Sequence, residues 1–431
     1  MHPHASALRE ILRKLDGGAP LPATVREKAK LMLLDTVGCI LSGRLSREVR
    51  SLESSLAQLE SGPFRFPGGS PLSTQAAAAV GAMASTWDEG CEGLAYAHGR
   101  PALPVVACLL PLSLTKQASV EQTLRSLVTG YEVGARAGGW LRIKPGMHVD
   151  GNWPCLGVAA AVASLLKQDA WTAINIAACQ LPASLYLPIK TGDNARNTYI
   201  AHSAWLGMLA AFSAEAGVTA PADALAHYAA GFAVPDKNVP PAEHWFLLDA
   251  YFKLHACVRH AHYAIEAARQ IRTQLNGDTQ RISSIRLVTY PEAITYAGNR
   301  APRTPIQGQF SVSLGVAAGL RFGGMEADIY RAPKFEDAEL RRLEALVELQ
   351  GDPAMTRRQA FLTLVSNGKA FEASCDRVSG DPGMPIEPAA IVAKFLRYSS
   401  GAVPPDKAAA FAAALMDESP GDFAALWALL H

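Results

Sequence analysis

The stretch Tyr251-Phe-Lys-Leu-His-Ala-Cys-Val-Arg-His-Ala-His262 contains one lysine, one arginine and three histidines. The apolar pattern that follows predicts a helix over residues 259–275. If this helix begins earlier, His255, Arg259 and His262 share one of its faces. Cations and proton donors at the start of a helix favour an anionic ligand, and histidine exchanges protons near neutral pH. The alternative interpretation is a solvated basic helix end.

Three further polar stretches lie upstream, at 87–102, 144–155 and 187–202. The first follows a segment of small residues, Ala, Gly, Ser and Met, that predicts a closely packed helix over 73–87. Polar loops that are held between rigid helices often line functional sites. We therefore expect Asp88, His148, Lys253 and at least one of His98 or Arg100 to converge.

The chain has 431 residues, which is more than a single hydrophobic core usually contains. Helical periodicity dominates, and the sequence predicts a mainly α fold with a large all-helical domain over 1–264. A smaller α+β lid domain is expected over 265–390, and a helical return to the first domain over 391–431. Within the lid, alternation predicts strands at 281–290 and 359–365, and a charged helix is expected at 335–349.

Composition argues against several classes of partner. Lys and Arg number 40 and Asp and Glu number 39, so the net charge of +1 gives no sign of nucleic-acid or membrane-surface binding. The seven cysteines are scattered and show no paired spacing, as is typical of a reducing compartment. No signal peptide or membrane-spanning run is apparent, so we expect a cytoplasmic protein.

Metal and thiol chemistry fit the residues less well than acid–base chemistry. His255, His260 and His262 do not have a zinc-site spacing, and the lysine and arginine between them repel a cation. A nucleophilic Cys91 or Cys257 is a weak alternative, because buried cysteine is common. The remaining class moves protons beside an anion held by Arg and Lys, without metal or cofactor.

Several stretches, in order along the chain, resemble the MmgE/PrpD family, which includes 2-methylcitrate dehydratase, cis-aconitate decarboxylase and iminodisuccinate epimerase. The resemblance implies a large helical domain, a small α+β lid, a homodimer, and a cofactor-free site between the domains. The stretches that carry it are 21–43, Trp87-Asp-Glu-Gly, Gly99-Arg-Pro-Ala, Gly130-Tyr-Glu-Val-Gly-Ala-Arg, Gly146-Met-His, Lys253-x3-Cys-x-Arg-x2-His262 and Gln309-Phe-Ser-Val-Ser.

Three residues match the family's site positions directly: Asp88, His148 and Lys253. Elsewhere the chain departs from the pattern, because Arg100 replaces the histidine before the proline of the acidic loop and His98 lies two residues earlier. Val258 and Leu314 stand where a histidine and a tyrosine are expected. The complete set of catalytic candidates is Asp88, His98, His148, Lys253, His260 and His262.

The expected substrate-binding residues are Arg100, Lys190, Arg196 and Arg259. Whether His98 or Arg100 takes the role of the acidic-loop histidine is open, as is the choice of Lys190 or Arg196 for the family's third-loop lysine. The sequence thus predicts a cofactor-free lyase or isomerase that acts on a small di- or tricarboxylate through an α-carbanion. Dehydration, decarboxylation and epimerisation stay open. A metal-dependent hydrolase and a catalytically inactive helical scaffold are the alternatives.

Overall fold

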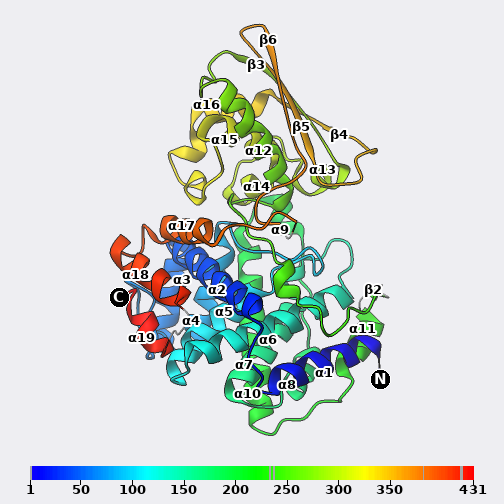
Figure 1. The fold of residues 1–431 in the computed structure, drawn as a ribbon, viewed down its shortest axis with the longest axis vertical. Helices are drawn as coiled ribbons and strands as arrows, with labels where there is room; N and C mark the ends of the chain where they lie inside the picture. Colours follow the sequence, from blue (N-terminus) through cyan, green and yellow to red (C-terminus); the bar gives the residue numbers. More distant parts are fainter. Residues whose placement is uncertain (1, 233, 236–237, 382, 418–420) are drawn as a thin grey trace.

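The structure is a computed structural model that describes residues 2–232, 234–235, 238–381, 383–417 and 421–431. Figure 1 shows a large helical body below a smaller body that contains a sheet. Helices predominate in the described residues, so the prediction of a mainly α fold is confirmed. The division into a helical domain, a mobile lid and a C-terminal return stays a prediction. No helix in these ranges is both long and apolar enough to cross a membrane.

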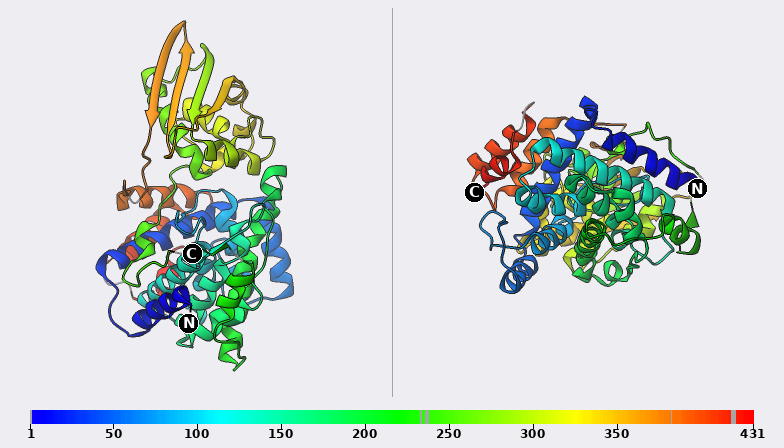
Figure 2. Two further views of the ribbon diagram at one scale, coloured as in Figure 1. Left: turned by 90° about the vertical axis from the view of Figure 1, so that its right-hand side faces the viewer. Right: turned by 90° about the horizontal axis from the view of Figure 1, so that it is seen from below.

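The large body is built from the first eleven helices together with the last three, and Figure 2 shows both chain ends on it. Its helices are α1 (Pro3–Asp16), α2 (Ala23–Gly43), α3 (Arg47–Leu59), α4 (Thr74–Trp87), α5 (Ala102–Thr115), α6 (Val120–Trp140), α7 (Pro154–Leu166), α8 (Ala170–Ala178), α9 (Leu187–Thr191), α10 (Thr198–Glu215), α11 (Ala224–Phe232), α17 (Pro388–Ser399), α18 (Pro405–Met416) and α19 (Phe423–Ala428). A short ribbon pairs β1 (Leu141–Arg142) with β2 (Val234–Pro235).

Small residues allow the central helices of this body to pack closely. Helix α4 consists largely of small residues, with six alanines among its 14 positions, and packs against α2, α5 and α10. Helices α6 and α7 meet at Gly130, where a Cβ atom would lie 2.7 Å from the carbonyl oxygen of Gly157. Helix α17 is joined to α2 by an ion pair of 2.5 Å between Lys394 Nζ and Asp35 Oδ1. These contacts give the loop after α4 a rigid support.

The small body contains a four-stranded sheet in the order β4-β3-β5-β6, in which only β3 and β4 run parallel. Helices α12 and α15 pack against each other, and α12 also packs on β5 and β6. The elements are α12 (Arg259–Gln274), β3 (Ile282–Thr289), α13 (Pro291–Ala297), α14 (Pro305–Gln309), α15 (Val312–Phe322), α16 (Ala338–Leu346), β4 (Val347–Gly351), β5 (Ala360–Ser366) and β6 (Lys369–Cys375).

One local prediction in this region is wrong. The charged helix expected over 335–349 ends at Leu346, because the next residues form β4 and pair with β3. Pairing with a neighbouring strand therefore overrides the helical pattern at this point. The helix predicted over 259–275 is confirmed as α12, and because it begins at Arg259, the condition under which His255 would share a helical face with His262 is not met.

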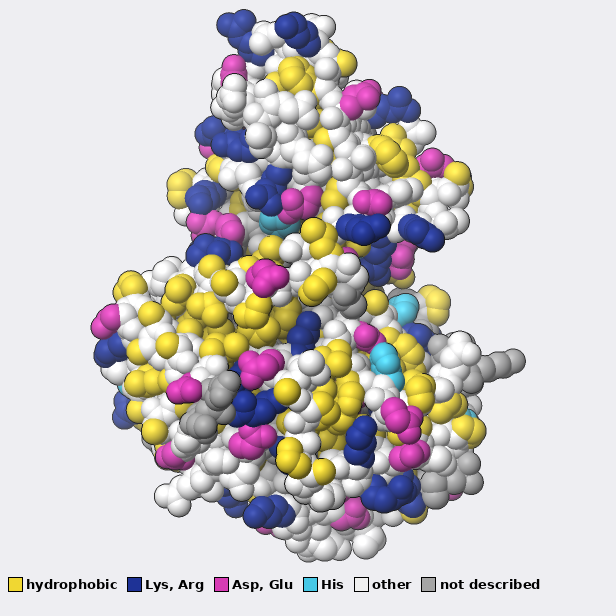
Figure 3. Space-filling model, in the orientation of Figure 1, with side chains coloured by type: hydrophobic (Ala, Val, Ile, Leu, Met, Phe, Trp, Pro, Cys, Tyr) yellow, Lys and Arg dark blue, Asp and Glu magenta, His cyan; other side chains and the backbone are white. Residues whose placement is uncertain are grey.

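The polar loop at 88–102 lies where the two bodies meet. Gln309 Nε2 of the small body donates to the Trp87 carbonyl at 2.7 Å, and Arg331 Nη2 donates to Asp88 Oδ2 at 3.1 Å. Figure 3 shows a waist at this level, with Lys and Arg side chains lying among Asp and Glu side chains along the lower edge of the small body.

The close approach of α6 and α7 predicts that Gly130→Ala destabilises the fold. The added methyl group would also lie 2.7 Å from Ala161 Cβ, and such overpacking typically costs about 1–3 kcal/mol. As the control, Gly231→Ala lies in α11, where an added Cβ meets nothing within 4 Å, and should be neutral or stabilising by up to about 1 kcal/mol. Urea unfolding of both variants measures the difference, and equal stabilities would contradict the proposed packing.

Candidate active site

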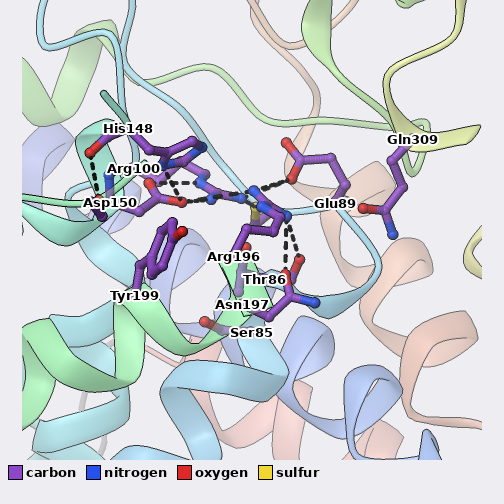
Figure 4. A network of polar contacts seen from close by, with 12 residues as sticks. Ser85, Thr86, Glu89, Arg100, His148, Asp150, Arg196, Asn197, Tyr199 and Gln309 are labelled. Atoms are coloured by element: carbon purple, nitrogen blue, oxygen red, sulfur yellow. Dashed lines mark hydrogen bonds and ion pairs between the residues drawn. The ribbon is translucent and has the colours of Figure 1, made fainter. Parts of the chain in front are cut away.

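A buried carboxylate, Glu89, lies at the centre of the polar stretches. Lys253 Nζ donates to Glu89 Oε1 at 2.6 Å, and Arg100 Nη1 donates to Oε2 at 2.9 Å. Arg196 Nη2 donates to the same Oε2, also at 2.9 Å (Figure 4). Each cation comes from a different part of the chain. Glu89 therefore joins the first polar stretch to the third and the fourth.

A second carboxylate, Asp150, completes the cluster from the remaining stretch. The guanidinium of Arg100 bridges the two acids, since its Nη2 donates to Asp150 Oδ2 and its Nη1 donates to Glu89. Asp150 Oδ2 also lies 3.7 Å from Arg196 Nη2 and 3.6 Å from His148 Nδ1. All four polar stretches thus contribute a charged or titratable side chain to one network, as Figure 4 shows for three of them.

The charges of this network do not cancel. Glu89, Arg100, Asp150, Arg196 and Lys253 are all buried. Burial alone raises the pKa of Glu89, but Arg100, Lys253 and Arg196 together hold it well below its usual range. Burial lowers the pKa of Lys253, yet the charge of Glu89 outweighs this and raises it. Three cations therefore face two carboxylates, which leaves an excess of one positive charge.

His148 is a neutral member of the site. Burial, followed by the charges of Arg196 and Arg100, lowers the pKa of His148 well below its ordinary value. Its Nδ1 accepts a hydrogen bond from the Asp150 amide at 3.2 Å, so the neutral ring carries its proton on Nε2. The ring stacks on Tyr186 at 5.9 Å. A neutral imidazole of this kind acts as a hydrogen-bond donor towards a reacting group.

The backbone at Glu89 is held in an uncommon conformation. Its φ of 54° lies in the left-handed region, which is unfavourable for a residue with a side chain and recurs at functional sites. Lys253 Nζ donates to the Glu89 carbonyl at 3.2 Å, and Lys394 Nζ donates to the Gly90 carbonyl at 2.5 Å. The two lysines thus fix the turn that directs Glu89 into the cluster.

Around Arg196, four buried polar atoms have no hydrogen-bond partner in the described part of the chain. Two are N–H donors, one is a hydroxyl and one is an amide oxygen: Arg196 Nε, Asn197 Nδ2, Thr86 Oγ1 and Gln309 Oε1. Arg196 Nη1 lies 3.1 Å from Asn197 Oδ1 and 3.4 Å from the Thr86 carbonyl, so at least three of these residues are neighbours (Figure 4). Buried polar atoms without partners call for a ligand or solvent, and the donors here suit a carboxylate.

Two of the predicted site residues have other partners. Asp88 accepts hydrogen bonds from Ser42 Oγ at 2.6 Å and from Arg331, so it joins the two bodies and does not pair with Lys253. Arg259 forms an ion pair of 2.6 Å with Asp381 and donates to the carbonyl oxygens of Val378 and Ser379. It holds this loop and makes no described contact with the cluster.

The histidines and Lys190 lie apart from the cluster as well. His98 and Lys190 are exposed, and neither side chain bonds to a described member of the cluster. His260 Nδ1 lies 2.6 Å from the Tyr290 hydroxyl, and burial, Arg358 and Lys253 lower its pKa to about 3. His262 Nδ1 lies 3.3 Å from Arg259 Nη1. Of the pairs His98 or Arg100 and Lys190 or Arg196, between which the sequence did not decide, Arg100 and Arg196 are the residues that lie in the network.

Glu89 and Asp150 were absent from the residues proposed from the sequence. The available signal was indirect: each lies within two residues of a candidate, and two arginines buried in one site require carboxylate partners. In the ranges that the structure describes, no group of three His, Cys, Asp or Glu residues has the arrangement of a metal site.

Comparison with known proteins gives a consistent result over most of the chain. The model of the MmgE/PrpD N-terminal domain matches residues 18–241, and that of the MmgE/PrpD C-terminal domain matches residues 255–417. The matched segments contain every residue of the cluster except Lys253, which lies between them. No curated protein matches the chain.

The buried network predicts a pH-dependent loss of stability in Glu89→Gln. Because the folded pKa of Glu89 is depressed, its stabilisation is fully present above the unfolded value of about 4.5 and is lost as the pH falls through the folded pKa. At pH 7 we expect the variant to be about 3–5 kcal/mol less stable, since it leaves buried cations uncompensated.

Denaturant unfolding of Glu89→Gln between pH 7 and pH 3 measures this effect. The difference from the wild-type protein should shrink below pH 4.5. Glu336→Gln, at an exposed glutamate without an ion pair in the described structure, is the matched control and should follow the wild-type curve. A pH-independent difference for Glu89→Gln would contradict the assigned ionisation.

Proposed function

The chain belongs to the MmgE/PrpD family, and we propose that it is a cofactor-free lyase or isomerase that acts on a small carboxylate. Family membership suggests dehydratase-type activity on carboxylates, and the di- or tricarboxylates expected from the sequence fall within this class. The observation that carries the proposal is the excess positive charge beside the unpartnered donors of Arg196 and Asn197. A homodimer and a cytoplasmic location stay predictions.

We propose that one substrate carboxylate binds at Arg196. Its oxygens would accept hydrogen bonds from Arg196 Nε and Asn197 Nδ2, two buried donors that have no partner among the described residues. A carboxylate at this position neutralises the excess charge of the network. Arginine is suited to this role, because its planar fork remains protonated and binds carboxylates through two parallel hydrogen bonds.

Binding would then convert Glu89 into the general base. With no ligand, three cations hold the pKa of Glu89 well below its usual range, so it is a weak base. A substrate carboxylate competes with Glu89 for Arg196 and Arg100. As these contacts weaken, the burial of Glu89 raises its pKa and allows it to accept the proton on the carbon next to the carboxylate.

The remaining groups stabilise the charge that develops. Proton removal places negative charge on the substrate's carboxylate oxygens, beside Arg196 and Arg100, and a well-placed donor lowers such a barrier by about 3–4 kcal/mol. Lys253 stays protonated because its pKa is raised, so it serves as a fixed cation. His148 donates from Nε2 to the departing group or to the forming oxyanion.

The Glu89→Gln variant tests whether Glu89 acts as the general base or only holds the structure together. The variant should lose at least about 10²-fold in kcat, because the base is removed. It should nevertheless bind carboxylates more tightly, because glutamine competes less strongly for Arg100 and Arg196. Proton exchange in D₂O, followed by NMR with a panel of carboxylates, measures turnover, and calorimetry measures binding. Loss of both binding and exchange in the folded variant would contradict the proposed base.

Substitutions of Arg100 and His148 should affect different kinetic constants. Arg100→Lys keeps the charge but loses the fork between Asp150 and Glu89, so KM should rise by about tenfold with a smaller change in kcat. His148→Ala should lower kcat by about 10²-fold with little change in KM. Steady-state kinetics on the most active carboxylate of the panel test both, and an unchanged kcat for His148→Ala would exclude it from catalysis.

A further inference from the structure

A cavity of about 170 Å³ adjoins the site at His148. It lies among three segments that are distant in the sequence: the chain after α6, the residues before α9, and the end of α11. Most of its wall is apolar, formed by Leu141, Ile143, Met147, Ala183, Phe232 and the ring of Tyr228. The proposed reaction uses none of these side chains.

The polar residues of the wall bond mainly to one another or to the backbone. Asn152 Nδ2 donates to the Pro182 carbonyl at 2.8 Å and to the Tyr228 hydroxyl at 3.0 Å. Ser184 Oγ donates to the His148 carbonyl at 3.0 Å. Two cations complete the lining: Arg142, whose Nη1 donates to the Tyr96 carbonyl at 2.9 Å, and the exposed Lys144. The interior of the cavity therefore favours an apolar group.

The volume of the cavity indicates the size of that group. An apolar protein cavity of roughly 150 Å³ stays dry and binds benzene. A cavity of about 170 Å³ therefore accommodates a phenyl ring or a short branched alkyl chain. A hydrophobic pocket discriminates about 10–200-fold between two substrates that differ by one methylene group. A filled cavity would thus make a strong contribution to substrate choice.

His148 connects the cavity with the charged network. His148 is one of the residues that line the cavity, and its Nδ1 lies 3.6 Å from Asp150 Oδ2. A ligand with its carboxylate near Arg196 and its substituent in the cavity would therefore have its reacting carbon close to His148. The single excess positive charge of the network matches one carboxylate at that end.

We propose that the cavity is the subsite for an apolar substituent of the substrate, which is an aryl- or alkyl-substituted carboxylate with one carboxylate in the charged network. This inference rests on the proposed function, and it narrows the substrate from any small carboxylate to one that carries an apolar substituent. The substituent has about the size of a phenyl ring.

Ala183 allows a direct test, because it lines the cavity and a larger side chain there should reduce the cavity's volume. The probes are succinate and phenylsuccinate, which differ by the ring alone, with calorimetry for binding and proton exchange in D₂O for turnover. The wild-type protein should bind phenylsuccinate at least tenfold more tightly than succinate. Ala183→Phe, or the milder Ala183→Leu, should abolish this preference and leave succinate binding unchanged. Ala195→Phe, at an exposed alanine outside the cavity, is the matched control and should preserve the preference.

The outcomes separate this inference from the proposed function. Equal binding of both probes by the wild-type protein, or a preference that survives both Ala183 variants, would overturn the subsite, even if succinate exchanges its protons. Binding of phenylsuccinate that depends on Ala183, without proton exchange of either probe, would support the subsite and contradict the lyase or isomerase. Unchanged succinate binding shows that the variants are folded.

Discussion

The burial of Glu89 is the constraint on which the site depends. An ionised carboxylate inside a protein is tolerated only when cations and hydrogen bonds replace its hydration. Arg100, Arg196 and Lys253 provide that replacement, and they come from stretches that are separated by up to about 150 residues of chain. Lys253 also precedes α12, the first helix of the small body. One carboxylate therefore couples the helices of the large body to the segment that enters the small one.

The same constraint explains why arginines at this site change its chemistry. A histidine becomes neutral when it is buried, but an arginine remains charged and needs an acidic partner. Arg100 uses both sides of its fork, one for Glu89 and the other for Asp150. Arg196 Nε and Asn197 Nδ2 have no partner among the described residues, so an incoming carboxylate can bind there and weaken the hold of Arg196 on Glu89. Substrate binding and activation of the base become one event.

The sequence predicted the mainly α fold, because helical periodicity persists over many residues. It did not identify Glu89 in preference to Asp88. The two are adjacent, and they face different partners because the chain leaves α4 with φ of −93° at Asp88 and 54° at Glu89. The amino-acid sequence alone did not indicate this change of backbone direction. The predicted end of α16 was wrong for a related reason, since the residues that follow it form β4 only because β3 lies beside them.

The apolar cavity was equally invisible in the sequence, because its walls come from three ordinary apolar segments that only the fold brings together. The charged network and the cavity also act on a ligand through different kinds of interaction. The charged network acts on the reacting carboxylate through strong interactions, whereas the cavity discriminates by its volume and by the apolar character of most of its wall. His148 lies at the boundary between them. Changes to the network should therefore affect all carboxylates alike, while changes to the cavity wall alter which carboxylate is chosen.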